Sequence, residues 1–207
     1  MTEALTRRLI EAVASRLIAA ADDLTALDRL TGDGDHGGNL KLGCEAVLAQ
    51  VEQLAQRPLP DALRAIGNIL QMKVGGASGP LYGTLFVAMG KGLAQDFGQA
   101  PAQDPAKIAA ALQAATMAVQ RLGRSEPGCK TMVDVLAPVQ RLLGEGGPDL
   151  PARVDARAAE AAEATAAMKA TRGRAAFLGD RSIGHVDPGA RSAQLMIAAI
   201  CSVLRDA

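Results

Sequence analysis

Residues 27–39 of this 207-residue chain read LDRLTGDGDHGGN, and the rest of the fold must accommodate this unusual segment. It contains three aspartates, Asp28, Asp33 and Asp35, together with four glycines and His36, one of only two histidines. Glycine is costly inside a helix or strand, and neighbouring carboxylates repel each other, so a packed element rarely has this composition. Hard divalent cations bind oxygen ligands, and glycine lets near neighbours in the chain converge. The segment therefore predicts a cation-binding loop in which the three aspartates are the metal ligands.

The composition favours closely packed helices. Hydrophobic residues make up 49% of the chain but aromatic residues only 2%, whereas a sheet normally draws on aromatic and β-branched side chains. The chain has 22 basic and 22 acidic residues, so we expect no basic surface for nucleic acid. The length suits one large domain or two small ones, and no segment has the composition of an interdomain linker. We therefore expect a single domain over residues 1–207.

The cysteines and the apolar runs indicate a cytoplasmic protein. Cys44, Cys129 and Cys201 are far apart and odd in number, which fits neither a metal-binding CxxC pattern nor a disulfide framework. No apolar run reaches the roughly 18 residues of a membrane span, and the charged N-terminal segment does not resemble a secretory signal. We expect no contact with a membrane.

Apolar periodicity and helix start signals predict an all-α fold of eight helices. The predicted helices cover residues 2–22, 38–56, 60 to beyond Leu70, 85–95, 104–123, 131–143 with a kink at Pro138, 151–171, and 187 to about 204. Short connections between helices favour antiparallel neighbours. The prediction is therefore an antiparallel up-and-down bundle or a closed helical barrel.

Four irregular segments interrupt this pattern, and they are expected at the same end of the molecule. They are residues 27–39, Val74–Thr84, Gly123–Met132 and Arg172–Gly189. Each precedes an even-numbered helix, and in an up-and-down arrangement all even-numbered helices start at one end. Helix N-termini carry unpaired N–H groups and a partial positive charge, which favours an anion. We expect the four segments to form one rim that binds an anion.

Carboxylates and an anion at the same rim are compatible if Mg²⁺ lies between them. Mg²⁺ accepts one or two protein carboxylates together with phosphate oxygens, so three aspartates suffice for two ions on a nucleotide. Phosphoryl transfer requires positioning and charge neutralisation, which such a site supplies. An ordinary turn is the alternative for Asp33 and Asp35, because Asp-Gly-Asp sequences are frequent in turns. His36 and His185 both fall in glycine-rich segments at the same predicted end, so each is either a ligand at the site or a structural residue.

The other three segments also leave alternatives open. Val74–Thr84 is either a plain loop or a phosphate-contacting loop with Ser78 as its polar group, and it lacks the Gly-Lys-Ser/Thr of a Walker A motif. The arginines of Arg172–Gly189 form either a solvated run or a phosphate contact. Met132 belongs to the core or packs on an adenine ring.

Four motifs resemble those of one family. LDRLTGDGDHGGN, VGGASGPLYGT (74–84), EPGCKTMVDVLAP (126–138) and GRAAFLGDRSIGHVDPGA (173–190) are similar, in this order, to the nucleotide-binding L subunit of bacterial dihydroxyacetone kinases. The resemblance covers almost the whole chain and implies an eight-helix barrel that binds ADP or ATP with two Mg²⁺ ions at one end. The family often has an acidic residue where this chain has Cys129.

The resemblance also implies which residues form the site. It assigns the metal to Asp28, Asp33 and Asp35, and it requires no catalytic side chain that is itself phosphorylated. It assigns the nucleotide to His36, Gly37, Gly38, Asn39, Ala77, Ser78, Gly123, Met132, Arg174, Asp187, Pro188 and Gly189.

The resemblance further implies that the chain acts with partner subunits. A K subunit would hold dihydroxyacetone covalently through its own histidine, so neither histidine of this chain would link the substrate. In one variant of the family a phosphotransferase-system M subunit rephosphorylates bound ADP in place, with phosphoenolpyruvate as the source, and we favour this variant. The alternatives are an ATP-dependent kinase for dihydroxyacetone or another small ketose, and a nucleotide-dependent regulatory module. A homodimer is left open.

Overall fold

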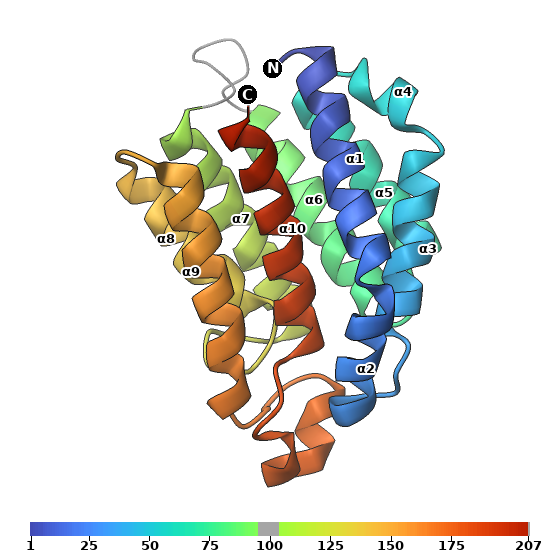
Figure 1. The fold of residues 1–207 in the computed structure, drawn as a ribbon, viewed down its shortest axis with the longest axis vertical. Helices are drawn as coiled ribbons and strands as arrows, with labels where there is room; N and C mark the ends of the chain where they lie inside the picture. Colours follow the sequence, from blue (N-terminus) through green and yellow to red (C-terminus); the bar gives the residue numbers. More distant parts are fainter. Residues whose placement is uncertain (95–103, 207) are drawn as a thin grey trace.

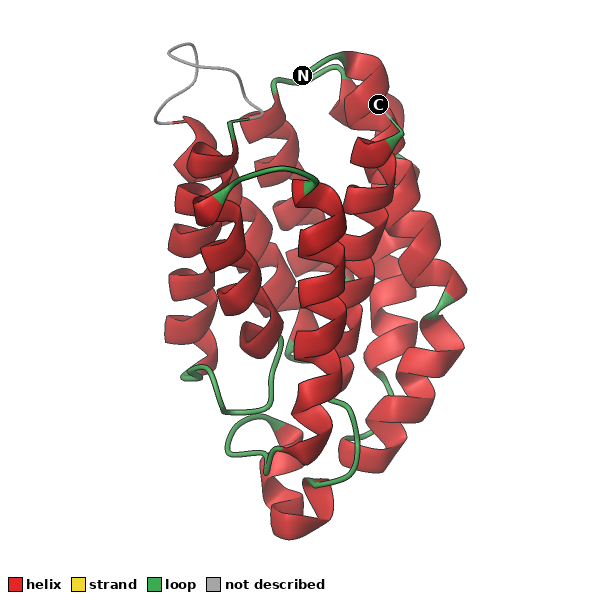
Figure 2. Cartoon of the chain, turned by 60° about the vertical axis from the view of Figure 1, so that its left-hand side comes forward, coloured by secondary structure: helices red, strands yellow, loops and turns green. Residues whose placement is uncertain are grey.

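The computed structural model describes residues 1–94 and 104–206, and it is built of helices joined by short connections (Figure 1). The α-helices are α1 (Glu3–Ala19), α2 (Ala21–Thr31), α3 (His36–Leu48), α4 (Val51–Ala55), α5 (Leu59–Lys73), α6 (Ser78–Ala94), α7 (Pro105–Gly123), α8 (Val133–Glu145), α9 (Leu150–Ala164) and α10 (Pro188–Arg205). Two 3₁₀ helices, η1 (Thr165–Ala167) and η2 (Arg174–Ser182), lie between α9 and α10. The described residues contain no β-strand (Figure 2), which confirms the predicted all-α class.

The long helices form a closed ring around one core. In order, α1, α3, α5, α6, α7, α8, α9 and α10 each contact the next helix, and α10 returns to contact α1. Helix α2 extends the line of α1 and packs on α3 and α10, whereas the short α4 packs on α1 and α5. A single connected set of buried apolar residues runs from Ile10 on α1 to Cys201 on α10. Of the two arrangements that the sequence leaves open, a bundle or a closed barrel, the contacts show the closed barrel.

The two ends of this barrel differ. Both chain termini lie at one end, and the connections α2–α3, α5–α6, α7–α8 and α9–α10 lie at the other (Figure 1). These connections contain the four irregular segments, so four helix N-termini open onto the same rim, as expected.

The first predicted boundary is wrong, because the chain remains helical well past Asp22. After a break at Ala20, α2 continues to Thr31, so Asp28 lies on a helix and not in a loop. Its buried residues, Ala21, Leu24, Asp28 and Thr31, are spaced by three, four and three positions, which places them on one face. The predicted helix over residues 38–56 is likewise divided into α3 and α4. The described chain therefore has more helical segments than the eight predicted.

Two further predictions misplace a helix boundary. The segment Val74–Thr84 was expected to be irregular throughout, but α6 begins at Ser78, which leaves only residues 74–77 outside a helix. The predicted helix to Thr171 ends as α9 at Ala164, where the buried Thr165 hydroxyl turns back to donate to the Ala162 carbonyl, 2.6 Å away. Gln95, the predicted last residue of the fourth helix, lies outside the described residues.

Glycines explain why α6 starts early. Gly79 and Gly83 suggest a loop, but in the structure they let α6 approach α5 closely. A Cβ atom added at Gly83 would lie 2.8 Å from the Gly67 carbonyl oxygen, and one added at Gly67 would lie 2.7 Å from the Gly83 carbonyl oxygen. Side chains at these positions would force the two helices apart. The close contact brings the N-terminus of α6 next to the end of α5.

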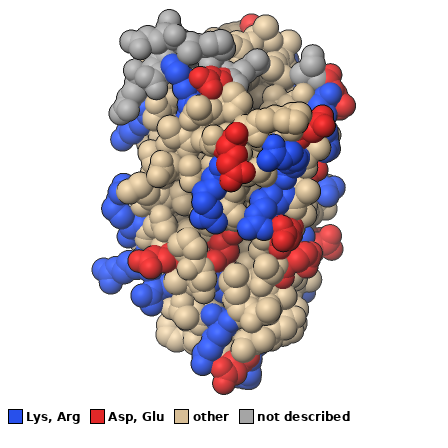
Figure 3. Space-filling model, turned by 90° about the vertical axis from the view of Figure 1, so that its left-hand side faces the viewer, with Lys and Arg blue, Asp and Glu red and all other residues tan. Residues whose placement is uncertain are grey.

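The outer surface mixes charges of both signs. On the face formed by α8 and α9, Lys and Arg side chains alternate with Asp and Glu (Figure 3). Among the helices of the described residues, none combines the length and the apolar character that crossing a membrane requires. Charged side chains thus lie on the outside of the barrel, while its apolar core lies inside.

The α5–α6 contact can be tested with one pair of variants. We expect Gly67→Ala to lower the free energy of unfolding by about 2 kcal/mol, because its Cβ would meet backbone atoms of α6 that cannot move aside. Gly144→Ala on α8 is the control, since the nearest atom to its added Cβ is 3.8 Å away. There alanine's higher helix propensity should raise stability by about 0.5 kcal/mol. Urea denaturation measures both, and equal effects would contradict the packing argument.

Candidate functional site

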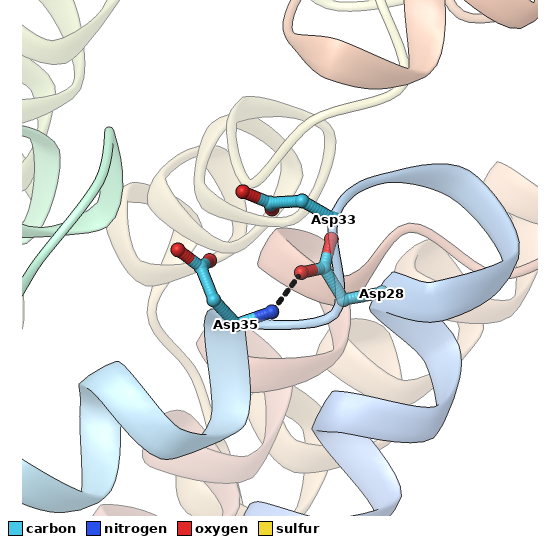
Figure 4. Close-up of side chains that lie close together, drawn as sticks. All are labelled: Asp28, Asp33 and Asp35. Carbon is cyan, nitrogen blue, oxygen red and sulfur yellow. Dashed lines mark hydrogen bonds between the residues drawn. The ribbon is translucent and has the colours of Figure 1, made fainter.

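The three predicted metal ligands lie together at the rim. Asp28 is on the last turn of α2 and is buried, whereas Asp33 and Asp35 follow in the connection to α3 and are exposed. One carboxylate oxygen of each residue lies within 4.8 Å of those of the other two. Figure 4 shows the three carboxyl groups turned toward a common space. Oxygen atoms in this arrangement are the ligands that Mg²⁺ prefers, so the residues fit a divalent cation.

The buried Asp28 holds this connection in place. Its Oδ2 atom accepts hydrogen bonds from the backbone N–H groups of Asp35 (2.9 Å) and His36 (3.1 Å), the first of which is drawn in Figure 4. Gly34 has a φ of 75°, a left-handed conformation that glycine adopts at low cost and that reverses the chain between Asp33 and Asp35. Asp35 occupies the N-cap position of α3 but makes no side-chain cap hydrogen bond. Its carboxylate is therefore not used to hold the helix.

Arg174 joins the aspartate cluster from the other side of the rim. It is the first residue of η2, and its guanidinium forms a 2.6 Å ion pair with Asp33. Its side chain is 59% exposed, so the ion pair is accessible to solvent. An arginine fork beside metal-ligating carboxylates can contact phosphate oxygens that share the same cation. The residue predicted to bind the nucleotide is thus next to a predicted metal ligand.

His36 lies just behind the rim and connects three helices. The residue is 7% exposed, and both of its ring nitrogens have partners. Nδ1 is 2.8 Å from the Ser78 hydroxyl at the start of α6, and Nε2 is 2.9 Å from the Ser192 hydroxyl on α10. Ser192 is in turn 2.6 Å from the Tyr82 hydroxyl. The N-termini of α3, α6 and α10 are therefore tied together by side-chain hydrogen bonds.

Burial lowers the pKa of His36 from its ordinary value, and the negative charges of Asp28 and Asp35 only partly oppose this effect. The imidazole is therefore neutral at physiological pH, with one nitrogen that donates and one that accepts. The hydrogen bonds of the ring show the structural role of His36, and its role in nucleotide binding stays a prediction. Its ring is buried among hydroxyl groups, while its backbone starts the helix that follows the aspartates.

The glycine segment between α5 and α6 lies beside the start of α3. A Cβ added at Gly75 would meet the Asn39 Oδ1 atom at 2.7 Å, and one added at Gly76 would lie 3.6 Å from Asp35 Oδ2. Gly38 faces open space, since no heavy atom of the described residues lies within 4 Å of a Cβ built there. Gly37 differs, because it is buried against the Ala21 carbonyl and allows α3 to pack on α2. Gly38 and the glycine segment thus leave backbone accessible at the rim.

The start of α10 packs on the start of α8. Asp187 is the N-cap residue of α10, and its Oδ2 atom accepts the Ala190 N–H at 2.7 Å. A Cβ added at Gly189 would lie 3.0 Å from Asp187 Oδ2 and 3.6 Å from the Met132 nitrogen, so this glycine lies between the N-cap of α10 and the start of α8. Met132 is 4% exposed and belongs to the core at the rim. Pro188 is buried as the first residue of α10.

Lys130 is a part of this site that sequence reasoning missed. Its side chain is 1% exposed, and its Nζ atom donates to the carbonyl oxygens of Thr165 (2.6 Å) and His185 (2.5 Å). Burial lowers the pKa of Lys130, whereas the charges of Asp187 and Asp134 oppose this shift. The lysine fastens the α7–α8 connection to the segment that leads into α10. Its only sequence signal was its place inside a glycine-rich segment.

The structure therefore brings most of the predicted residues into one continuous arrangement. Ser78 contacts His36, the glycine segment before Ala77 lies against Asn39, and Gly189 adjoins Met132. Gly123, the last residue of α7, lies against Leu81 of α6, where a Cβ would be 3.4 Å from Leu81 Cδ2. Besides Lys130, the prediction lacked Tyr82 and Ser192. Tyr82 is the chain's single tyrosine, which was its only distinguishing signal.

These features define a closed helical barrel with a carboxylate cluster and exposed helix N-termini at one end. The model of the DAK2 domain family matches residues 30–202 of the chain. The chain belongs to the DAK2 domain family. This result and the relatives below confirm the resemblance that the four motifs predict.

Relatives from two bacteria match most of the chain. The PEP-dependent dihydroxyacetone kinase 1, ADP-binding subunit DhaL, of Listeria innocua is 40% identical over 177 residues, which cover 86% of this chain and 84% of the relative. The PEP-dependent dihydroxyacetone kinase, ADP-binding subunit DhaL, of Escherichia coli is 38% identical over 180 residues, which cover 84% of each chain. Both relatives are named as subunits of a kinase.

A solved structure shares the fold. It is the dihydroxyacetone kinase from C. freundii in complex with AMP-PNP and Mg²⁺, which superposes with a TM-score of 0.77 at 27% sequence identity. The match covers 96% of this chain but only 34% of that kinase chain. The chain thus spans about a third of the solved kinase.

The partly buried Asp187 makes the stability of the fold depend on pH. Burial raises the pKa of its carboxyl group from 3.8 to about 7, although the Ala190 N–H and the Lys130 charge oppose the rise. A carboxyl group with a raised pKa in the folded state stabilises the fold fully below its unfolded pKa, and this contribution is lost as the pH rises through 7. Between pH 5 and 8 we expect the wild type to lose roughly 2 kcal/mol of unfolding free energy relative to Asp187→Asn.

Asparagine caps a helix as well as aspartate does, so this variant removes the titration and keeps the cap. Denaturation with urea at several pH values measures the difference. Asp149→Asn, at the exposed N-cap of α9, is the matched control and should leave the pH profile unchanged. Parallel profiles for wild type and Asp187→Asn would contradict the assignment.

Proposed function

We propose that this chain is the ADP-binding subunit of a dihydroxyacetone kinase and that residues 1–207 form its single nucleotide-binding domain. The carboxylate cluster of Asp28, Asp33 and Asp35 at a rim of helix N-termini carries the proposal. The names of the bacterial relatives and the nucleotide complex of the solved kinase support it. The core that connects Ile10 to Cys201 supports a single domain.

The aspartates would hold two Mg²⁺ ions against the phosphates of the nucleotide. Bound there, the metal would neutralise the phosphate charge and polarise the terminal phosphoryl group. The buried Asp28 orients the connection through two backbone N–H groups, while Asp33 and Asp35 present their oxygens to solvent. Three carboxylates carry more negative charge than one divalent ion neutralises, which favours two ions. No side chain of this protein needs to be phosphorylated.

The rest of the rim would hold the nucleotide. The exposed backbone around Gly38 and at Ala77, together with the Ser78 hydroxyl, suits phosphate oxygens. Arg174 would add its charge on the side of Asp33. Gly189 and Met132 pack together at the start of α10 and α8, where an adenine ring would find an apolar surface beside the Asp187–Pro188–Gly189 turn. Gly123 would border this surface.

We propose that the phosphoryl acceptor arrives on a separate K subunit, which carries dihydroxyacetone. Three apolar side chains at the rim end are suited to contact that partner: Phe177 on η2, Leu30 on α2, and Ile183 are 91%, 52% and 45% exposed. Helices α2 and η2 contact each other, so these residues share one end of the barrel (Figure 1). A partner that covers this end would also exclude water from the phosphoryl group.

For the phosphoryl donor we favour a phosphotransferase-system M subunit that rephosphorylates ADP in place with phosphoenolpyruvate. The names of the PEP-dependent relatives support this choice over an ATP-dependent kinase. The nucleotide that remains after purification and desalting tests it. Retained ADP supports the coenzyme variant, and an empty site with rapid ATP exchange supports the alternative. The homodimer and the cytoplasmic location stay predictions from the sequence.

The complete activity is tested by reconstitution. The chain, a K subunit with dihydroxyacetone, and a phosphoryl-donor system together should form dihydroxyacetone phosphate, and the chain alone should not. If ADP binds but no K subunit receives phosphate, the nucleotide-dependent regulatory module becomes the better interpretation. If the chain is also active with another ketose and the K subunit that binds it, the partner subunit determines the substrate.

Replacing Asp35 tests the metal assignment. Asp35→Asn should weaken Mg²⁺-dependent ADP binding by about 100-fold or more, because it removes a charged ligand from the cation. The fold should persist, since the Asp35 side chain makes no helix-cap hydrogen bond. Calorimetric titration of ADP with and without Mg²⁺ is the measurement. Asp22→Asn, in the first turn of α2, is the control. Unchanged binding in Asp35→Asn rules out this residue as a ligand.

Replacing Phe177 tests the proposed docking end. Phe177→Ser should reduce affinity for the K subunit about tenfold, because a buried aromatic anchor contributes strongly to an interface. Its affinity for ADP with Mg²⁺ should match that of the wild type. Met117→Ser, on the outer face of α7 and 49% exposed, is the matched apolar control. Equal K-subunit affinity for both variants would place the partner elsewhere.

A further inference from the structure

A chain of four polar side chains leads from the rim into the interior. Ser78 at the rim contacts His36 Nδ1, His36 Nε2 contacts Ser192, and Ser192 contacts Tyr82, with separations of 2.8, 2.9 and 2.6 Å. The Ser192 and Tyr82 hydroxyls also lie 3.1 and 3.4 Å from the Gly189 carbonyl oxygen. Ser192 is 0% exposed and Tyr82 is 3% exposed, so neither can reach a ligand directly.

A phosphate oxygen would determine the direction of every hydrogen bond in this chain. Such an oxygen only accepts hydrogen bonds, so a Ser78 hydroxyl that contacts it must donate its single O–H to that oxygen. The Ser78–His36 bond must then be donated by Nδ1–H. A neutral imidazole carries one proton, so Nε2 becomes an acceptor and Ser192 must donate to it. The Ser192 proton is then no longer directed at Gly189.

Tyr82 is the last donor in this chain of hydrogen bonds. Once Ser192 donates to His36, its oxygen is free to accept, and the Tyr82 hydroxyl is the donor at 2.6 Å. Burial raises the pKa of Tyr82, so its proton is retained at physiological pH. Each of the four groups then has one donor role and a partner that accepts. No group changes charge in this arrangement.

We propose that Ser192 and Tyr82 are positioning residues for the nucleotide, which act through His36 to direct the Ser78 hydroxyl proton at a phosphate oxygen. The inference rests on the proposed function, because it requires a phosphate at the rim. It assigns a task to the single tyrosine of the chain, and to a buried serine on the last helix. It also states which nitrogen of His36 carries the proton in the nucleotide complex, namely Nδ1.

Binding measurements test this coupling. Ser192→Ala should weaken ADP binding in the presence of Mg²⁺ about tenfold, and Tyr82→Phe about threefold, because each removes one donor behind Ser78. Thr116→Val is the matched control. It removes another buried hydroxyl of the barrel, whose oxygen has no hydrogen-bond partner among the residues that the structure describes. This variant should bind ADP as the wild type does.

A double-mutant cycle separates positioning from a general loss of structure. In a Ser78→Ala background the Ser192→Ala substitution should cost almost nothing further, because the proposed path to the phosphate is already broken. If Ser192→Ala weakens binding equally in both backgrounds, its role is structural and the inference is wrong.

Nitrogen NMR of the histidine rings gives an independent readout. The chain has two histidines, so His185→Gln leaves the His36 signals alone in the spectrum. With ADP and Mg²⁺ bound, Nδ1 should carry the proton and Nε2 should be bare. A complex with the proton on Nε2 would overturn the inference. Failure of the wild type to bind ADP would instead contradict the proposed function.

Discussion

The site depends on one buried carboxylate and on the two hydrogen bonds that it accepts from backbone N–H groups. Asp28 lies on the last turn of α2, and its Oδ2 atom accepts hydrogen bonds from the backbone N–H groups of Asp35 and His36 at the start of α3. A buried carboxylate is costly unless hydrogen bonds satisfy it, and unpaired N–H groups at a helix start are costly for the same reason. Here the two N–H groups satisfy the Asp28 carboxylate, and the carboxylate satisfies the two N–H groups. As a result the turn between the two helices has one shape, which places Asp33 and Asp35 beside Asp28.

The closed ring of helices turns this local arrangement into a complete rim. Since neighbouring helices alternate in direction, α3, α6, α8 and α10 all start at the same end, and the aspartates precede the first of them. Side-chain bonds between these starts then fix their spacing. His36 reaches Ser78 and Ser192, and Lys130 reaches the carbonyls of Thr165 and His185. The rim is therefore held by polar contacts, whereas the barrel below it is held by apolar packing.

Sequence patterns predicted the all-α class, the common end of the four segments and the grouping of the aspartates, because periodicity and composition are local signals. They failed where a long-range contact decides the local structure. Gly79 and Gly83 favour a loop by propensity, but their packing against α5 makes them helical. Thr165 lies in an alanine-rich run that favours a helix, but its hydroxyl donates to the Ala162 carbonyl at the end of α9 and accepts the Asp187 N–H. Lys130 could not be recognised, since its partners are carbonyls 35 and 55 residues away.

The hydrogen bonds of His36 also bear on where the ketone must be held. A histidine that links a ketone covalently needs a ring nitrogen with an unshared pair and room for the carbonyl carbon. Both ring nitrogens of His36 are engaged by serine hydroxyls, and the residue is 7% exposed. His36 therefore has no ring nitrogen free to link a ketone. This agrees with the proposal that the phosphoryl acceptor arrives on a separate subunit.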